Sequence, residues 1–322
     1  MRLGTRASAL ALAQAQLVAQ LLEAEQGAGT VEIVPIVTRG DRESAGVDDA
    51  AGALTGDGAQ GQPPPGEDKS RWVSELERAL AHGEIDVAVH SAKDVPGELG
   101  EGLALLAAPP RAAAEDVLCG AAGLDELPSG ARVGTSSVRR IAQLCAFRED
   151  LQPVSMHGNV DTRLRKLAGG EFDAIVLARA GLTRLGREQA VGAVLDAARF
   201  IPAPGQGMLA LEGRQDDAAM REAAAAIGDA ETLSCLLAER ALARALGASC
   251  DTPLGALARA EGEDGLLLRA WIGVPDGSAW IEDELSGAAE HPEALALALA
   301  ARLELAGARA LLDAAEDIAA AQ

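Results

Sequence analysis

The chain has 322 residues, of which 48% are hydrophobic and only 2% aromatic, so alanine, leucine and valine must fill its interior. This length exceeds that of a usual single-core domain, and we expect two or three domains. A formal net charge of −21 argues against nonspecific binding to nucleic acid or to an anionic membrane surface.

Strand and helix patterns alternate through the first two thirds of the chain. A short strand at 2–4 leads into a helix at about 8–25 and then into a strand at 31–38. The alternation continues through RWVSELERALAHG, IDVAVHS, GLALLAAPP, RVGTSSVRRIAQLCAF, VSMHGNVDTRLRKL, FDAIVLARAGLTRLG and IPAPGQGMLALE. Such alternation predicts α/β domains with largely parallel sheets.

The segment from about Arg42 to Asp68 interrupts this alternation. It is rich in Gly, Pro and Asp and contains the run QPPPGED. A segment of this composition cannot bury enough apolar surface to order itself, so we predict a mobile loop.

The pattern changes past Glu212. Two helices, at about 216–227 and 230–246, are followed by the stretch LGASCDTPLG, a hairpin-like pair of strands and a final helix at about 292–315. This order predicts a smaller α+β domain with Cys250 at its entrance. Cys250 lies on a bend of small residues, whereas Cys235 lies inside an apolar run, so the Cys250 thiol is presented rather than packed.

Cysteine and histidine spacing favours no metal site. The four cysteines form no CxxC pair, and the four histidines are scattered. Free thiols in a reducing compartment are the simplest interpretation. The N-terminus lacks the pattern of a secretion signal and no run approaches 18 apolar residues, so we expect a soluble, cytoplasmic protein.

Three strand-to-helix turns share one design. GTRAS, GTSSVRR and HGNVDTR each contain a glycine, a Ser, Thr or Asn that can cap a helix, and nearby arginines. A helix start binds anions through its free N–H groups, and Arg6, Arg139, Arg140 and Arg163 would add bidentate partners. Arginine near a helix start opposes the helix dipole, and a purely structural role does not explain why three turns carry it. The turns therefore favour a polyanionic ligand.

A second polar cluster ends the apolar strand IDVAVHS. His90, Ser91, Lys93 and Asp94 could simply begin a loop. The carboxylate of Asp94 directly follows one of only three lysines, and it could stabilise a cation or move a proton. His90 is equally available as an acid or base on spacing alone, and we interpret it as structural.

The motifs HSAKDVP, VGTSSVRR, GNVDTRL, DAIVLARAGLTRLG, PAPGQG and GASC, in that order, closely resemble the hydroxymethylbilane synthase (porphobilinogen deaminase) family. The resemblance covers nearly the whole chain. It implies a transferase that condenses four porphobilinogen molecules head to tail into the linear tetrapyrrole hydroxymethylbilane, releasing ammonia, in porphyrin and haem biosynthesis. It also implies a monomer with no stable protein partner.

The resemblance implies three domains. Two are α/β domains like those of periplasmic binding proteins, with the active site in the cleft between them, and the third is a smaller C-terminal α+β domain. The implied boundaries are 1–109 with 208–225 for the first domain, 110–207 for the second, and 226–322 for the third.

The resemblance also assigns a cofactor and a set of site residues. Dipyrromethane, one per chain and made from substrate, would be held by a thioether at Cys250, and Asp94 would be the catalytic residue that assists ammonia loss. The implied cofactor-binding residues are Lys93, Asp94, Thr135, Ser136, Ser137, Arg139, Arg140, Arg163 and Arg184. The implied substrate-binding residues are Arg6, Ser8, Lys69, Trp72, His157, Arg163 and Arg184.

Two departures from the family pattern stand out. The chain has DKSRW where many members have Gly-Lys-Gly-Leu-Phe after a shorter loop, and His157 stands where many have arginine. A histidine binds a carboxylate less strongly than an arginine does. A non-catalytic two-domain binding protein for anionic solutes, or a degenerate family member, therefore remains an alternative.

Overall fold

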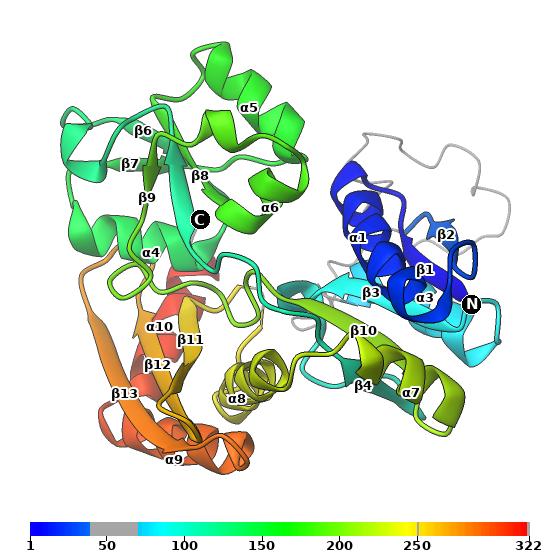
Figure 1. Ribbon diagram of the computed structural model, residues 1–322. Helices are drawn as coiled ribbons and strands as arrows, with labels where there is room; N and C mark the ends of the chain where they lie inside the picture. The colour runs from blue at the N-terminus through cyan, green and yellow to red at the C-terminus, as the bar shows by residue number, and fades with distance from the viewer. Residues whose placement is uncertain (39–69, 250, 321–322) are drawn as a thin grey trace, which may run out of the picture.

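The computed structural model describes residues 1–38, 70–249 and 251–320 (Figure 1). Lys69, Cys250 and the loop predicted over 42–68 lie outside the described residues, as does the side chain of Trp72. Within the described residues the strands form two five-stranded sheets and one three-stranded sheet. In Figure 1 the two α/β units lie at the upper left and the right, and the C-terminal domain lies at the lower left.

The first sheet has the order β2-β1-β3-β10-β4. β1 pairs in parallel with β2 and β3, whereas β10 runs antiparallel to both β3 and β4. Its strands are β1 (Arg2–Arg6), β2 (Glu32–Ile36), β3 (Val87–Ser91), β4 (Leu103–Ala107) and β10 (Leu209–Arg214). Its helices are α1 (Ala9–Gln26), α3 (Ser70–Ala81) and α7 (Ala218–Ala226).

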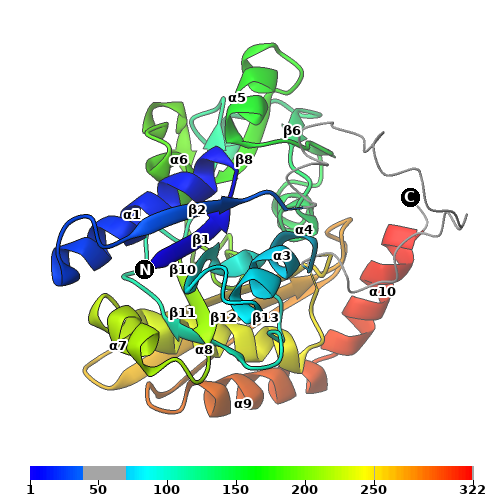
Figure 2. The same cartoon turned by 90° about the vertical axis from the view of Figure 1, so that its right-hand side faces the viewer.

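Side chains of this sheet alternate between two apolar layers. Leu3, Val87 and Val89 pack with Val18 and Leu22 of α1 in one layer. The other layer joins the opposite face of the sheet to α3 through Ala88, Leu76 and Leu80. Figure 2 shows β1 between α1 and α3. The period-2 alternation of a strand therefore buries both faces of the sheet.

The second sheet has the order β7-β6-β8-β5-β9. β6 pairs in parallel with β7 and β8, and β5 runs antiparallel to β8 and β9. Its strands are β5 (Asp116–Cys119), β6 (Arg132–Gly134), β7 (Gln152–Val154), β8 (Ala174–Ala178) and β9 (Ala193–Val194). Its helices and helical turns are η2 (Leu124–Glu126), α4 (Val138–Phe147), α5 (Val160–Ala168), α6 (Arg179–Arg184) and η3 (Glu188–Ala190).

The third sheet is antiparallel, with the order β11-β12-β13. Its elements are α8 (Ala230–Ala245), β11 (Leu254–Glu261), β12 (Gly265–Gly273), β13 (Trp280–Ala288), α9 (Pro292–Leu305) and α10 (Ala308–Ala320). The predicted hairpin is confirmed as β11 and β12, but β13 was not predicted. The single final helix predicted at 292–315 is wrong, because the chain breaks at Gly307, whose φ of 104° favours glycine.

The predicted fold class, two α/β units and a smaller α+β unit, is confirmed. The prediction of largely parallel sheets holds for β1 with its neighbours and for β6 with its neighbours. It is wrong for β10 and β5, which run antiparallel beside the parallel strands. The reason is the chain path, since each of these strands enters its sheet directly from a segment that crosses between the two sheets.

Two crossing segments connect the first and second sheets and hydrogen-bond to each other, with Ala112 N donating to Gly207 O over 3.2 Å. Gly205 and Gly207 have φ values of 76° and 86°. A Cβ atom on Gly205 would lie 2.9 Å from Lys93 N, and one on Gly207 would lie 2.5 Å from Ala112 O. Glycine is therefore required here by both conformation and close approach.

Candidate active site

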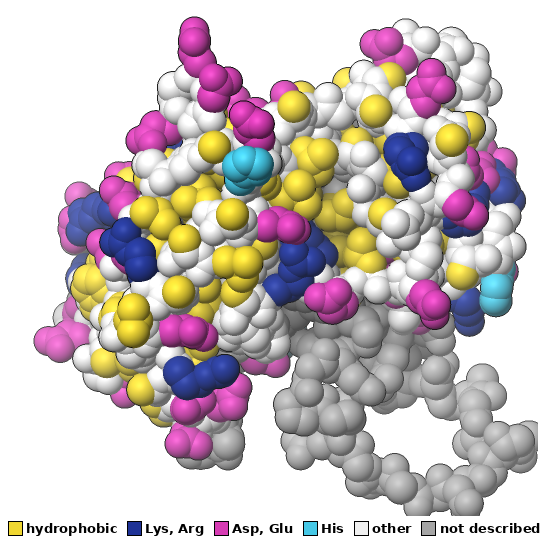
Figure 3. Space-filling view, turned by 90° about the horizontal axis from the view of Figure 1, so that it is seen from below, with side chains coloured by type: hydrophobic (Ala, Val, Ile, Leu, Met, Phe, Trp, Pro, Cys, Tyr) yellow, Lys and Arg dark blue, Asp and Glu magenta, His cyan; other side chains and the backbone are white. Residues whose placement is uncertain are grey.

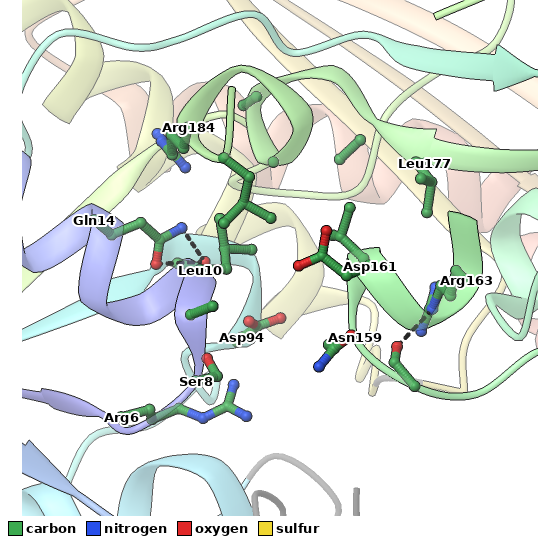
Figure 4. A pocket seen from close by; sticks show the side chains of 18 of the residues that line it. Arg6, Ser8, Leu10, Gln14, Asp94, Asn159, Asp161, Arg163, Leu177 and Arg184 are labelled. Atoms are coloured by element: carbon green, nitrogen blue, oxygen red, sulfur yellow. Dashed lines mark hydrogen bonds between the residues drawn. The ribbon is translucent and has the colours of Figure 1, made fainter. Parts of the chain in front are cut away.

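A cleft of about 1150 Å³ lies between the first and second sheets (Figure 4). One wall comes from the β1–α1 turn and from η1 (Ala92–Asp94), which directly follows β3. The opposite wall comes from the β7–α5 turn and from α6. Of the predicted residues, those that line the cleft are Arg6, Ser8, Lys93, Asp94, Arg140, His157, Arg163 and Arg184.

The helix caps predicted for the three turns are partly confirmed. Ser8 and Asn159 occupy the N-caps of α1 and α5, and their side chains accept from Ala11 N at 3.3 Å and Thr162 N at 2.9 Å. Ser137 occupies the N-cap of α4, but its side chain makes no capping bond. Two of the three helix starts thus carry the predicted side-chain cap.

Asp94 and Lys93 lie in η1, directly after β3, whose first four residues are buried. In Figure 4 Asp94 points into the cleft, with Ser8 from one wall and Asn159 from the other. Burial lowers the pKa of Lys93 from 10.5 to about 8, although the Asp94 carboxylate raises it. The lysine is therefore a cation whose proton is held more weakly than usual.

Arg139 and Arg140 form a buried cluster with Asp116. Arg139 Nη2 lies 2.7 Å from Asp116 Oδ2, and Arg140 Nη2 lies 2.7 Å from Asp116 Oδ1. Each arginine also donates to a backbone carbonyl, of Ile201 or Val176. These two cations hold the pKa of Asp116 well below its usual range despite burial. Two guanidinium groups share one carboxylate, which leaves a net positive charge.

Arg163 and Arg184 have no carboxylate in salt-bridge distance within the described part of the chain. Arg163 Nε donates to Gly158 O, and Arg184 Nη2 donates to Gly207 O, both over 2.7 Å. Burial lowers the pKa of each to about 10. The buried Nε of Arg184 has no partner among the described residues. Unsatisfied buried cations fit an anionic ligand.

A second cavity of about 280 Å³ adjoins the first. Lys93, Asp94 and Arg140 line both cavities, and Ser249 and Thr252 line the second. Ser249 N donates to Thr252 Oγ1 over 2.8 Å, so these two residues are bonded to each other. The second cavity thus extends from the cleft to the residues that flank Cys250.

This cavity fits a dipyrrole that carries carboxylates. Its lining residues include Ser137, Arg139, Arg140 and Arg240. The buried Nε of Arg139 has no hydrogen-bond partner within the described residues, so the protein does not satisfy every donor of this cluster. Arginine forks bind carboxylates in bidentate fashion.

Comparison with known proteins agrees with this geometry. Residues 1–222 match the model of the porphobilinogen deaminase dipyromethane cofactor binding domain, and residues 233–305 match that of the porphobilinogen deaminase C-terminal domain. The chain is 44% identical over 312 residues to a porphobilinogen deaminase of Roseiflexus sp. (strain RS-1), covering 96% of this chain and 97% of that one. It is also 44% identical over 314 residues to that of Xanthomonas axonopodis pv. citri (strain 306), covering 97% and 98%.

The chain belongs to the porphobilinogen deaminase family. It is therefore a transferase (EC 2.5.1.61) of tetrapyrrole biosynthesis with a dipyrromethane cofactor, and the family predicted from the sequence is confirmed. Among solved structures, a periplasmic substrate-binding protein of an ABC transporter from Coxiella burnetii matches with a TM-score of 0.41 and 14% identity, covering 73% of this chain and 94% of that one.

The predicted hydroxyl residues of the second unit lie at different places. Ser137 lines the second cavity, whereas Thr135 and Ser136 line neither cavity. Thr135 Oγ1 accepts from Ser137 N, and Ser136 Oγ donates to Met156 O over 2.6 Å and accepts from Met156 N. Thr135 and Ser136 therefore hold the turn that carries the buried arginines.

His157 and His90 have contrasting surroundings. His157 lines the cleft, and its Nε2 lies 3.0 Å from Ser155 Oγ. His90 is buried on β3, with Nε2 2.8 Å from Glu212 Oε2 on β10. The interpretation of His90 as structural is confirmed, because its partner comes from the neighbouring strand of the sheet.

Two residues of the site, Asp116 and Arg240, were not predicted from the sequence. Asp116 begins a short apolar strand, and Arg240 lies on α8 within the otherwise apolar helical pattern TLSCLLAERALARAL. A charged residue at a core-facing position of such a pattern is a signal for a buried ion pair or a buried loop contact.

The described residues show neither a metal cluster nor a membrane-spanning helix. No group of three or more His, Cys, Asp or Glu side chains is placed there to hold a metal ion. No helix in that part of the chain is long and apolar enough to cross a membrane.

Proposed function

We propose that the cleft between the two sheets is where this enzyme condenses porphobilinogen, with Asp94 as its catalytic carboxylate. One observation carries this proposal: Asp94 lines both the open cleft and the cavity that reaches the residues flanking Cys250. A substrate in the cleft and a cofactor in the cavity would therefore meet at the same carboxylate.

The arginines bind and orient the chain of pyrroles. Each porphobilinogen carries an acetate and a propionate, so negative charge accumulates as the chain grows. Arg6, Arg163 and Arg184 present cations along the cleft. Arg139 and Arg140, held in place by Asp116, keep one net positive charge beside the second cavity. This charge offsets the carboxylates of the bound chain.

Asp94 acts on the substrate as ammonia leaves. The nitrogen leaves as ammonia from the protonated aminomethyl group: the carbon–nitrogen bond breaks, the nitrogen keeps the bonding electrons, and the positive charge passes to the pyrrole. A carboxylate held beside this cation lowers its energy. A new carbon–carbon bond then forms at the free α-carbon of a pyrrole, and the proton displaced from that carbon passes to a base, a role that fits Asp94.

The bound dipyrromethane would supply the first nucleophilic α-carbon, so that every chain begins on the enzyme. Lys93, Ser137, Arg139 and Arg140 would hold its carboxylates, because these side chains line the second cavity. His157 would contact substrate from the opposite wall of the cleft. Lys69 and Trp72 stay predicted substrate contacts, as does Cys250 as the anchor. A monomer in the cytoplasm likewise stays a prediction.

Replacing Asp94 by Asn tests the assignment. We expect Asp94→Asn to keep the cofactor adduct and to bind substrate, yet to lose nearly all turnover, because an amide cannot stabilise a developing cation. Asp94→Glu should keep part of the activity, since the charge survives with displaced geometry. Single-turnover rates and KM for porphobilinogen are the measurements.

Asp173→Asn is the matched control. Asp173 is exposed on the second unit, where it contacts Arg132, and it lines neither cavity. This control should turn over at the parental rate. Equal rates for wild type and Asp94→Asn would remove Asp94 from the mechanism. Binding of porphobilinogen without any turnover in the wild type would favour the alternative of a solute-binding or degenerate family member.

A further inference from the structure

Arg240 is a buried cation that the proposed mechanism does not use. It lies on α8 of the C-terminal domain and is 9% exposed. Its guanidinium donates to three consecutive backbone carbonyls, of Val95 at 3.2 Å, Pro96 at 2.7 Å and Gly97 at 3.0 Å. These residues directly follow Asp94, so α8 is bonded to the segment that carries the catalytic carboxylate.

The same segment is also attached to α8 by apolar contacts. Ala92 and Val95 belong to the hydrophobic cluster that contains Leu236 and Leu242 of α8. Because Ala92 and Val95 bracket Lys93 and Asp94, these contacts fix both ends of η1. A planar guanidinium with five donors then holds three carbonyls in one fixed geometry.

The residue before Arg240 bonds to a segment that packs against η1. Glu239 is fully buried, and its Oε2 accepts from Gly205 N over 2.5 Å. The Gly205 Cα closely approaches the backbone of Lys93, where a Cβ atom would lie 2.9 Å from Lys93 N. Two adjacent residues of α8 thus hold η1 from two directions.

The helix that carries Arg240 leads directly to the residues flanking Cys250. Beyond α8 the chain continues as a hydrogen-bonded turn, in which Leu246 N donates to Leu242 O and Ala248 N donates to Ala243 O. Arg240 and Ser249 line the same cavity as Asp94. One rigid helix therefore joins the loop after Asp94 to the segment expected to carry the cofactor.

We propose that Arg240 is a positioning residue that fixes Asp94 relative to the cofactor attachment segment of the C-terminal domain. This inference rests on the proposed role of Asp94. Arg240 itself touches backbone carbonyls rather than reacting atoms. Without the Arg240 guanidinium, residues 95–97 lose three hydrogen bonds and the Asp94 carboxylate is displaced. A displacement of about 1 Å costs on the order of 100-fold in rate.

Arg240→Met and Arg240→Lys test the inference in the cofactor-loaded full-length enzyme. We expect Arg240→Met to keep the adduct, to keep KM within about twofold, and to lower kcat by about 100-fold. Arg240→Lys should recover part of the loss, because an ammonium can still donate to some of the three carbonyls. Hydrogen–deuterium exchange should accelerate in the peptide spanning residues 92–100 in both variants, and more in Arg240→Met.

Arg302→Met is the control. Arg302 is an exposed cation on α9 of the same domain, paired with Asp283, and it lines neither cavity. It should leave kcat and the exchange of residues 92–100 unchanged. If Arg240→Met does not fold, Arg240→Lys decides the question, because it keeps the buried charge.

Two results would overturn the inference. One is a parental kcat in the folded Arg240 variants. The other is loss of the adduct with unchanged exchange of residues 92–100, which would make Arg240 a cofactor ligand instead. If the wild type itself shows no turnover, the proposed function fails, whereas the exchange experiment still decides whether Arg240 holds the loop.

Discussion

At the scale of single residues, Lys93 shows how burial changes a side chain that sequence alone only locates. The sequence places it beside Asp94, but its environment follows from the fold. Burial is the largest influence on its pKa, which falls from 10.5 to about 8. Its positive charge is therefore lost as the pH rises through about 8, in a range where an exposed lysine stays charged.

This shift predicts a specific pH dependence of substrate and cofactor binding. The KM for porphobilinogen should rise above about pH 8, because the neutral amine no longer attracts carboxylates. Lys93→Arg should remove this rise, since a guanidinium stays charged across the whole range. Initial rates measured between about pH 6 and 10 in both proteins check it. A wild-type KM that stays flat up to about pH 10 would contradict the prediction.

The lowered pKa of Lys93 also makes the unfolding free energy depend on pH, and here a higher pH is favourable. Between about pH 8 and 10.5 the unfolded chain keeps the Lys93 proton that the folded chain has released. The unfolding free energy contributed by this group therefore rises with pH across that window. Relative to Lys93→Met, the wild type should be least stable below pH 8 and should gain on the variant towards pH 10.5. Denaturant titrations at fixed pH values test this trend.

At the scale of elements, β5 and α4 are joined by a buried ion cluster. Asp116 of β5 pairs with Arg139 and Arg140 of α4, which lie 23 and 24 residues further along the chain. All three side chains are less than a tenth exposed. The cluster therefore connects two elements of the second unit while it directs positive charge towards the second cavity.

Arg139→Leu should therefore destabilise the fold more than Arg163→Leu does. Arg139→Leu removes one of the two partners of Asp116 and the bond to Ile201 O, and Arg140 still pairs with the carboxylate, so we expect a cost below the about 3–5 kcal/mol of breaking a buried pair outright. Arg163 has no carboxylate partner among the described residues, so its loss should affect substrate binding more than folding. Urea denaturation and KM compare the two variants. Equal losses of unfolding free energy would show that Asp116 does not depend on Arg139.

Local features of the elements could be predicted from the sequence, whereas features that depend on distant partners could not. The caps at Ser8 and Asn159 act on N–H groups three residues away, so the sequence shows both partners at once. The strand β13 was missed because its side chains alternate between exposed and half-buried positions and form no apolar run. The antiparallel direction of β10 depends on a chain crossing that no local pattern records.

At the scale of the whole molecule, three parts of the chain meet around one site. The first unit supplies Asp94 and Arg6, the second supplies the other cleft arginines, and the C-terminal domain supplies Arg240 and the residues flanking Cys250. The family resemblance gave the identity of most of these residues. It did not show that Asp116 pairs with two of the arginines or that α8 holds the loop after Asp94. Figure 3 shows acidic side chains over the periphery and a group of Lys and Arg side chains in the recess where two lobes meet.

Of the four thiols, we expect only that of Cys250 to attach the cofactor, and we expect the attachment to stabilise the whole molecule. The thiols that the structure describes are poor nucleophiles, because burial raises the pKa of Cys119 to about 11 and that of Cys235 to about 12, and burial also raises that of Cys145. Cys250 lies outside the described residues, and its neighbours Ser249 and Asp251 are exposed. We expect Cys250→Ser to lack the adduct of about 420 Da, since a hydroxyl is a much weaker nucleophile than a thiolate.

The melting temperature carries the second half of this prediction. Without dipyrromethane carboxylates, the buried donors of Arg139 and Arg140 in the second cavity lose partners worth about 1.5–3 kcal/mol each. Cys250→Ser should therefore melt several degrees below the wild type, whereas the half-buried Cys145→Ser should keep the adduct and lose only a little packing energy. Intact mass and thermal unfolding of both variants are the measurements. An adduct that persists in Cys250→Ser would place the anchor elsewhere, and an unchanged melting temperature without the adduct would show that the cofactor does not tie the three parts together.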